Sequence, residues 1–260
     1  MIGLKSDREL AIMRKAGGIV AEVLNVLGRS IKPGIETIEL DRQAEILIKE
    51  LGGRPAFKNY KGYPANICTS INEVIVHGIP GKKVLRDGDI ISVDVGAELE
   101  GYYGDAAYTY PVGNINDESK RLIEVTQKSL EKGIEAAVAG HRVSDISRAI
   151  QNFVEANGFN VIRAFIGHGI GADLHEPPEI PNFVTRECDL ASRDADPVLE
   201  NGMVLAIEPM VAAGKYAARI LSDGWTAVTV DKSRVAHFEH TVAVRDKGTE
   251  ILTLCQRKNR

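Results

Sequence analysis

The predicted elements run in the same order twice along the chain, and this repeat limits the fold more than any other feature. In the first half, a helix opens with the capping-box pattern Ser6-x-x-Glu9 and ends near Gly28. A second helix follows in "ETIELDRQAEILIKELGG", and then come strands. In the second half, "DESKRLIEVTQKSLEKGIEAAVAG" and "VSDISRAIQNFVEANG" predict two more helices before further strands. The order therefore predicts a duplicated α+β unit with halves of about 1–113 and 114–260.

The two halves align when 106 is added to each residue number of the first half. This shift aligns Gly34 with Gly140 and Gly52 with Gly158. The aligned apolar positions are Leu40 with Ile146, Leu47 with Phe153, and Ile48 with Val154. Because all amphipathic helices share a periodicity, the common element order is the stronger argument. Since the halves are not separated by a linker or a low-complexity segment, we expect one compact two-lobed domain over residues 1–260, with a ligand site between the lobes.

Composition predicts a globular protein of the cytoplasm. Hydrophobic residues make up 44% and charged residues 26% of the 260 positions, and the net charge is −4. This balance argues against a specific nucleic-acid partner or a membrane surface. Residues 1–10 lack the apolar segment of a signal peptide, and apolar runs fall short of a membrane span. Cys68, Cys188 and Cys255 form no CxxC pair and are expected to be reduced thiols.

Two aspartates lie within one predicted hairpin, "SVDVGAELEGYYGDAAY". A turn centred on Leu99 and Glu100 would place Asp94 directly opposite Asp105. Cross-strand partners have Cβ atoms about 4.5–5.5 Å apart, where like charges repel. If the pair is buried, one carboxyl must bind a proton or a cation must lie between them. The alternative is a hairpin whose two aspartates face solvent.

Three more polar residues occupy apolar or glycine-rich settings in the second half. They are His168 in "FIGHGIG", Glu208 in "GMVLAIEPM" and Glu239 in "RVAHFEHTVAV". Each alone is most often a solvated or structural residue. Together with the two aspartates they give four carboxylates and one imidazole, a donor set that suits a pair of divalent cations such as Mn, Fe, Co or Zn. "GHGIGA" fits a dinucleotide loop only in its glycines, because the following "DLHEPPEIP" cannot begin a helix. A dinuclear phosphoesterase would need a cluster of basic residues to hold phosphate, which these motifs lack.

These motifs resemble a known family. "NEVIVHGIP", "DGDIISVDVGAELEGYYGDAA", "GHGIGADLHEPP", "GMVLAIEPM" and "FEHTVAV" stand in the order found in type I methionine aminopeptidases of peptidase family M24. The resemblance implies the pita-bread fold, a pseudo-symmetric two-lobed α+β domain with a central antiparallel sheet flanked by helices. The segment "TRECDLASRDADPV" at 185–198 is polar and is expected to form an exposed loop near the rim.

The resemblance also implies a metal centre. Its ligands would be Asp94, Asp105, His168, Glu208 and Glu239, holding two divalent ions drawn from Fe(II), Mn(II), Co(II) or Zn(II). Asp105 and Glu239 would bridge the two ions. Asp94 would complete one site, and His168 with Glu208 would complete the other.

The activity implied is hydrolytic removal of the N-terminal methionine from nascent polypeptides. A hydroxide bridging the metals would attack the carbonyl of the first residue. His175 would hydrogen-bond that carbonyl, His77 the amide nitrogen, and Glu208 would pass a proton to the leaving amine. The expected partners are nascent polypeptide N-termini, with transient contact to the ribosome, and the expected state is a monomer.

The methionine pocket implied by the matched positions is apolar and aromatic. Its residues are Phe57, Tyr60, Tyr63, Cys68, Phe165 and Trp225, with ordinary core packing as the alternative. Phe57 stands where many bacterial relatives have cysteine, and Leu174 stands where relatives often have an aromatic residue. Two other functions stay open. An Xaa-Pro aminopeptidase shares the five ligands but usually has a large N-terminal domain, and a non-catalytic pita-bread binding protein has typically lost ligands.

Overall fold

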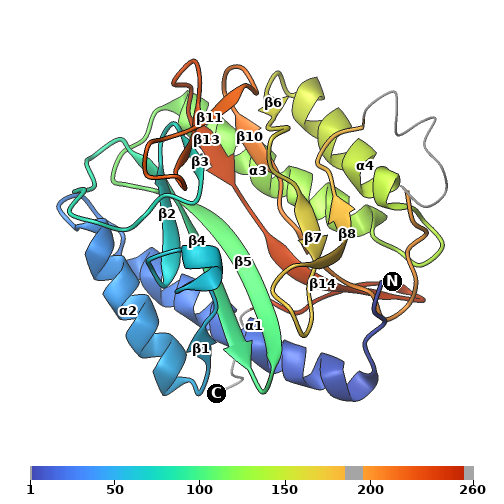
Figure 1. The fold of residues 1–260 in the computed structure, drawn as a ribbon. Coiled ribbons are helices and arrows are strands. Elements are labelled where there is room, and N and C mark those ends of the chain that lie inside the picture. Colours follow the sequence, from blue (N-terminus) through green and yellow to red (C-terminus); the bar gives the residue numbers. More distant parts are fainter. Residues whose placement is uncertain (1, 185–195, 255–260) are drawn as a thin grey trace, which may run out of the picture.

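The computed structural model describes residues 2–184 and 196–254, arranged in two lobes around a group of strands (Figure 1). The helices are α1 (Asp7–Ser30), α2 (Thr37–Glu50), α3 (Asp117–Ala136) and α4 (Val143–Ala156), with the 3-10 helix η1 (Tyr60–Gly62). The strands of the first half are β1 (Arg54–Pro55), β2 (Ile67–Ile71), β3 (Val74–Val76), β4 (Ile90–Leu99) and β5 (Tyr102–Pro111). Those of the second half are β6 (Asn160–Val161), β7 (Gly167–Gly169), β8 (Glu176–Ile180), β9 (Val204–Ile207), β10 (Met210–Ala212), β11 (Ala218–Ile220), β12 (Ala227–Thr229), β13 (Val235–His237), β14 (His240–Arg245) and β15 (Gly248–Ile251). Most of the predicted loop 185–198 lies outside the described residues, as do Cys188 and Cys255.

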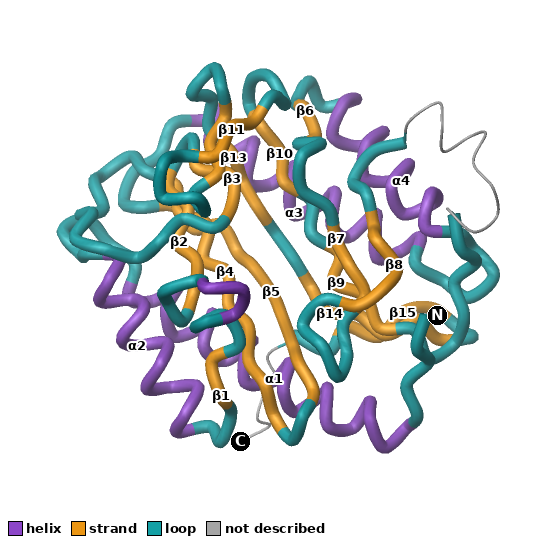
Figure 2. The backbone as a smooth tube through the Cα atoms, in the orientation of Figure 1, coloured by secondary structure: helices purple, strands orange, loops and turns teal. Residues whose placement is uncertain are grey.

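The strand pairs are antiparallel and lie at the centre of the molecule, with helices around them (Figure 2). In the first lobe, β4 pairs with β1, β2 and β5. In the second lobe, the sheet order is β15-β14-β9-β7-β8. Two three-stranded sheets, β13-β10-β6 and β11-β12-β3, complete the arrangement. The predicted α+β class is therefore confirmed.

The two halves repeat their local geometry at aligned positions. Gly34 and Gly140, which precede α2 and α4, have φ of 95° and 91°, a conformation that favours glycine. The bridge Glu36↔Val84 before α2 has its counterpart in Arg142↔Val198 before α4. These matches show the pseudo-symmetry of the lobes; the boundaries of the halves stay a prediction.

Helix α1 lies against the first sheet at an unusually close contact. A Cβ built on Gly104 of β5 would lie 2.7 Å from the backbone nitrogen of Gly17 in the helix. Only two glycines allow this approach. The helix begins as predicted, because the hydroxyl of Ser6 accepts from the Glu9 amide and Glu9 accepts from the Ser6 amide.

The β4–β5 hairpin is present, but its predicted register is wrong. Leu99 pairs with Tyr102, so the turn is Glu100-Gly101, with φ of 51° and 84°. A two-residue turn with positive φ at both positions matches the twist of a hairpin, and glycine at the second position favours it. Asp94 therefore pairs with Ala107, and Asp105 pairs with Gly96. A displacement of two residues keeps both carboxylates on the same face of the sheet.

Two threonines join the lobes where β5 meets β13 and β14. The Thr241 hydroxyl accepts from the Asp105 amide at 2.9 Å and donates to the Asp105 carbonyl at 2.7 Å. The Thr109 hydroxyl contacts the His237 amide and carbonyl in the same way, at 2.9 and 2.8 Å. Between these pairs, the amide of Glu239 donates to the carbonyl of Ala107 at 2.9 Å. This threonine contact fixes β5 relative to β14.

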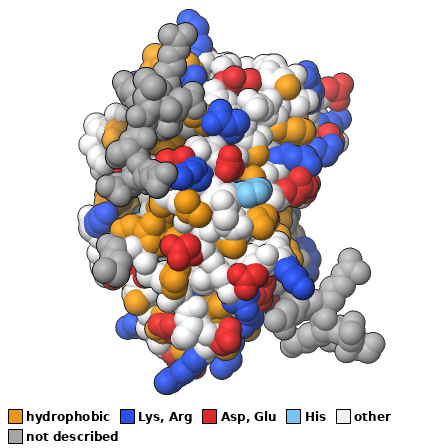
Figure 3. Space-filling model, turned by 90° about the vertical axis from the view of Figure 1, so that its right-hand side faces the viewer, with side chains coloured by type: hydrophobic (Ala, Val, Ile, Leu, Met, Phe, Trp, Pro, Cys, Tyr) orange, Lys and Arg blue, Asp and Glu red, His pale blue; other side chains and the backbone are white. Residues whose placement is uncertain are grey.

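The surface carries both signs of charge. On the face shown in Figure 3, lysine and arginine side chains are interspersed with aspartate and glutamate. Within the described ranges, no helix combines the length and apolar character needed to cross a membrane.

Candidate metal centre

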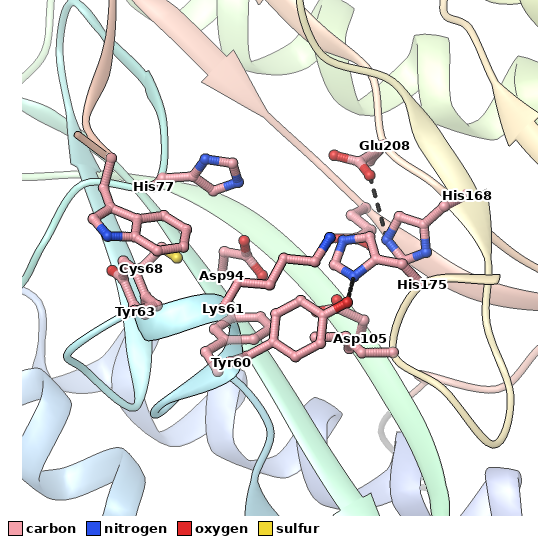
Figure 4. A pocket seen from close by; sticks show the side chains of 14 residues that line it. Tyr60, Lys61, Tyr63, Cys68, His77, Asp94, Asp105, His168, His175 and Glu208 are labelled. Carbon is pink, nitrogen blue, oxygen red and sulfur yellow. Dashed lines mark hydrogen bonds and ion pairs between the residues drawn. The ribbon is translucent and has the colours of Figure 1, made fainter. Parts of the chain in front are cut away.

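A cavity of about 180 Å³ contains nearly all the predicted site residues and receives side chains from both lobes (Figure 4). Its lining comprises Phe57, Tyr60, Lys61, Tyr63, Cys68, His77, Asp94, Asp105, His168, Leu174, His175, Glu208, Trp225 and Glu239. The first half supplies most of the apolar wall. The acidic groups come from both halves, in agreement with a site between them.

The predicted metal ligands converge at one end of this cavity. Potential ligand atoms of Asp105, His168 and Glu239 all lie within 4.8 Å of one another. Asp94 lies on the neighbouring strand β4, and Glu208 follows β9. Buried oxygens of Asp94, Asp105 and Glu239 have no hydrogen-bond partner. Buried polar atoms without partners are costly, so this set of oxygens fits a cation that would satisfy them together.

Burial controls the electrostatics of the four carboxyl groups. It raises the pKa of Asp94 to about 7 and that of Glu208 to about 7. It also raises the pKa of Asp105 and of Glu239 well above their usual range, and neighbouring carboxylates raise both further. A bound divalent cation reverses this balance because it favours the ionised form of each ligand. The four carboxylates and one imidazole form an oxygen-rich donor set, which suits Mn, Fe, Co or Zn. A structural zinc site would instead use thiolate ligands.

His168 has its ring oriented by its own backbone. Its Nδ1 donates to the carbonyl oxygen of Gly169 at 2.9 Å. A neutral imidazole with its proton at Nδ1 has a lone pair at Nε2, the atom available to a metal. Nε2 lies 3.7 Å from Oε1 of Glu208.

The two predicted substrate-facing histidines lie on opposite sides of the cavity (Figure 4). His175 forms a 2.8 Å hydrogen bond between Nδ1 and the Tyr60 hydroxyl, and the two rings are stacked 5.2 Å apart. Burial lowers the pKa of His175 to about 3 and that of His77 to about 4. Both rings are therefore neutral at neutral pH, and each has one N–H and one lone pair.

The apolar wall contains the other predicted pocket residues with one exception. Tyr63 and Trp225 meet edge to face at 5.1 Å and line the cavity beside Phe57 and Cys68. Phe165 lies outside the lining and packs edge-on against His77 at 5.5 Å. Its part in the methionine pocket stays a prediction.

Two residues at the site were missed from the sequence. His237 is buried, and its Nε2 lies 3.6 Å from Oε2 of Glu208. The period of two in a strand could have indicated it, because it stands two residues before Glu239. Lys61 lines the cavity at its mouth, where Figure 4 shows its side chain extending toward His175. No feature of the sequence around Lys61 indicates that position.

Comparison with known proteins gives close relatives. The model of metallopeptidase family M24 matches residues 11–246. Methionine aminopeptidase 1 of Bacillus subtilis is 54% identical over 253 residues, covering 97% of this chain and 99% of that protein. The crystal structure of a methionine aminopeptidase from Thermotoga maritima superimposes with a TM-score of 0.93 at 47% identity, covering 98% of this chain and 100% of that chain. An Xaa-Pro dipeptidase from Bacillus anthracis shares the fold at a TM-score of 0.76 and 23% identity, and the match covers 96% of this chain but 61% of that protein.

Proposed function

The chain belongs to the methionine aminopeptidases of metallopeptidase family M24, and on this premise we propose that its inter-lobe centre removes N-terminal methionine from polypeptides by metal-dependent hydrolysis. The type I family and the pita-bread fold predicted from the sequence are confirmed. The observation that supports the site is the group of buried, unpartnered carboxylate oxygens next to the Nε2 of His168.

The proposed ligands are Asp94, Asp105, His168, Glu208 and Glu239, holding two divalent ions. Fe(II), Mn(II), Co(II) and Zn(II) all suit these donors. When bound, such ions lower the pKa of water and stabilise the negative charge that develops on the carbonyl oxygen.

The chain's own groups would act on the two sides of the scissile bond. Neutral His175, held by the Tyr60 hydroxyl, can donate a hydrogen bond to the carbonyl oxygen as the carbon becomes tetrahedral. His77, on the opposite side, can contact the peptide nitrogen. Water adds its oxygen to the carbonyl carbon, the C–N bond breaks, and Glu208 passes the water's proton to the leaving amine.

The methionine side chain would occupy the apolar wall. Phe57, Tyr63, Cys68 and Trp225 offer aromatic and sulfur surfaces, which suit a flexible thioether. Tyr60 also lines the cavity, where its hydroxyl bonds His175. The proposed partners are the N-termini of nascent polypeptides, with transient ribosome contact, and the proposed state is a cytoplasmic monomer.

Hydrolysis of two peptides tests this function. Metal-stripped protein is assayed on Met-Ala-Ser and on Ala-Pro-Ser after addition of Mn(II), Co(II) or, under nitrogen, Fe(II). We expect metal-dependent release of methionine and no cleavage before proline. Cleavage of Ala-Pro-Ser would indicate the Xaa-Pro activity of the structurally related dipeptidases, and lack of activity on both peptides would favour a binding function.

A further inference from the structure

The carboxylate of Glu208 lies between two imidazoles, one at each oxygen. Nε2 of His168 is 3.7 Å from Oε1, and Nε2 of His237 is 3.6 Å from Oε2. His168 comes from β7 and His237 from β13, so Glu208 is approached from two different sheets. Among the residues that the structure describes, these two rings lie within 4 Å of the carboxylate, and Asp94, Asp105 and Glu239 line the same cavity.

The two imidazoles differ in whether Nε2 can donate a hydrogen bond to Glu208. The Nδ1 of His168 faces a carbonyl oxygen, which only accepts, so this nitrogen carries the proton. Its Nε2 then offers a lone pair, the form that binds a metal. That nitrogen cannot donate to Glu208, so Nε2 of His237 is the nitrogen of this pair that could donate to it.

The backbone of His237 is held by hydrogen bonds, whereas Nε2 of its side chain has no hydrogen-bond partner. The residue is 2% exposed, and its Nε2 has no hydrogen-bond partner. Its amide and carbonyl are both held by the hydroxyl of Thr109. A buried nitrogen without a partner is unfavourable, and Oε2 of Glu208 is an acceptor 3.6 Å away. The separation of 3.6 Å is a few tenths of an ångström longer than a hydrogen bond, and catalytic hydrogen bonds are often long in the free protein and shorten in the complex.

We propose that His237 is a positioning residue, whose Nε2–H donates to Oε2 of Glu208 and fixes the carboxylate in its working orientation. The ring does not line the cavity, so it acts through Glu208 and does not touch the substrate. Glu208 then keeps Oε1 toward Nε2 of His168. This inference rests on the proposed function, which assigns proton transfer to Glu208. The effect of His237 on metal binding is measured separately, as Co(II) affinity.

Two substitutions of similar size test the role of the N–H. His237→Gln keeps a side-chain N–H, and His237→Leu removes it. Hydrogen-bond partners of metal ligands typically change affinity or activity by about 10–100-fold when removed. We expect His237→Leu to lower kcat on Met-Ala-Ser by about 10–100-fold with KM changed less than about 3-fold, and to weaken Co(II) binding to the metal-stripped protein by about 10-fold or more. His237→Gln should stay within about 5-fold of wild type in both measurements.

His240→Leu is the matched control. His240 is also a buried histidine of this segment, but its ring bonds the Thr253 hydroxyl at 2.8 Å and not the centre. Its loss should lower stability while Co(II) affinity stays unchanged. Thermal unfolding of each metal-stripped variant establishes that it folds, and His237→Met replaces His237→Leu if the latter does not.

Three results would overturn the proposal. Wild-type kcat and Co(II) affinity in His237→Leu would remove any positioning role. Equal damage in His237→Gln and His237→Leu would make the imidazole itself the required group. An equal loss of Co(II) affinity in His240→Leu would reduce the effect to packing. If wild-type protein released no methionine while His237→Leu still weakened Co(II) binding, the proposed function would fail and the contact with Glu208 would stand.

Discussion

At the scale of single residues, the charge of the buried carboxyl groups that line the cavity dominates the electrostatics of the site. Asp105 is 4% exposed, and its Oδ1 has no hydrogen-bond partner. We expect Asp105→Asn to lower turnover by at least about 100-fold, because a neutral amide removes one of the anionic oxygens that we propose as metal ligands. Turnover and metal content by mass spectrometry measure the effect. Glu98→Gln, on strand β4 and paired with Arg54, is the control that should keep its metal. Near-normal turnover in Asp105→Asn would contradict a dinuclear centre.

The raised pKa values predict how the metal-free protein responds to pH. Burial raises the pKa of Asp94 and of Glu208 to about 7, above the unfolded values of 3.8 and 4.5. Between pH 4 and about 7 the unfolded chain loses these protons and the folded chain keeps them. Stability of the metal-free protein should therefore fall as pH rises through this range.

Urea midpoints at pH 5.5, 6.5 and 7.5, with and without saturating Mn(II), measure that response. The metal-free midpoint should fall with rising pH, whereas the loaded protein should gain most from metal at pH 7.5 because the ligands are then ionised. A metal-free midpoint that rises over this interval would show that the carboxyl groups ionise freely without a cation.

His175 tests the division between substrate contact and metal binding. Its Nδ1 is held by Tyr60, and its position opposite His77 suits contact with a carbonyl oxygen. We expect His175→Ala to lower kcat by about 100-fold while the protein retains its metal, as for other donors to a developing oxyanion. Tyr60→Phe, which removes only the orienting hydroxyl, should show a smaller loss. A parallel loss of metal in His175→Ala would instead make this histidine part of the metal centre.

At the scale of elements, the threonine contact brings the two predicted bridging ligands together. Thr241 bonds both backbone groups of Asp105, and Glu239 stands two residues before Thr241, with its own amide bonded to the carbonyl of Ala107. Replacing Thr241 by valine keeps the shape but leaves a buried amide and carbonyl unpaired, at a cost of about 1–3 kcal/mol for each group. We expect Thr241→Val to lower the free energy of unfolding by about 2–4 kcal/mol.

Thr241→Ser is the matched variant because it keeps the hydroxyl and loses only a methyl group. It should lose less than about 1.5 kcal/mol in urea denaturation and keep wild-type Co(II) affinity. Thr241→Val should weaken Co(II) binding as well, since Asp105 loses its anchor. Equal effects of the two substitutions would assign the contact to packing alone.

Helix ends could be predicted from the sequence where a few neighbouring residues determine them. The capping box at Ser6 marks the start of α1, and Gly52 and Gly158 mark the ends of α2 and α4, whereas α1 continues past the predicted end near Gly28 to Ser30. The hairpin was predictable, but its register depended on which residues take positive φ, and the pattern "ELEG" allows more than one turn. His237 was missed because its position beside Glu208 depends on a contact between separate strands, which periodicity within one strand does not encode.

At the scale of the whole molecule, the repeat explains why the site needs both lobes. Asp94 and Asp105 come from the first half, and His168, Glu208 and Glu239 come from the second. The duplicated order of elements predicted two lobes, while the identity of the ligands came from family motifs. Strand periodicity alone could not select these acids from the other acidic residues of the chain.

A ligand set divided between the lobes predicts how metal stabilises the molecule. Any ligand that binds only the folded state adds RT ln(1 + [L]/Kd), about 2.7 kcal/mol at 100 times Kd. Because the set spans both lobes, Co(II) should slow amide exchange in β4 and β5 of the first lobe and in β7 and β14 of the second. Hydrogen–deuterium exchange read by mass spectrometry measures both at once, and Asp105→Asn at the same Co(II) concentration should show neither change. Protection confined to one lobe would place the metal within that lobe, whereas protection in both would show that the cation holds the two halves together as one cooperative unit.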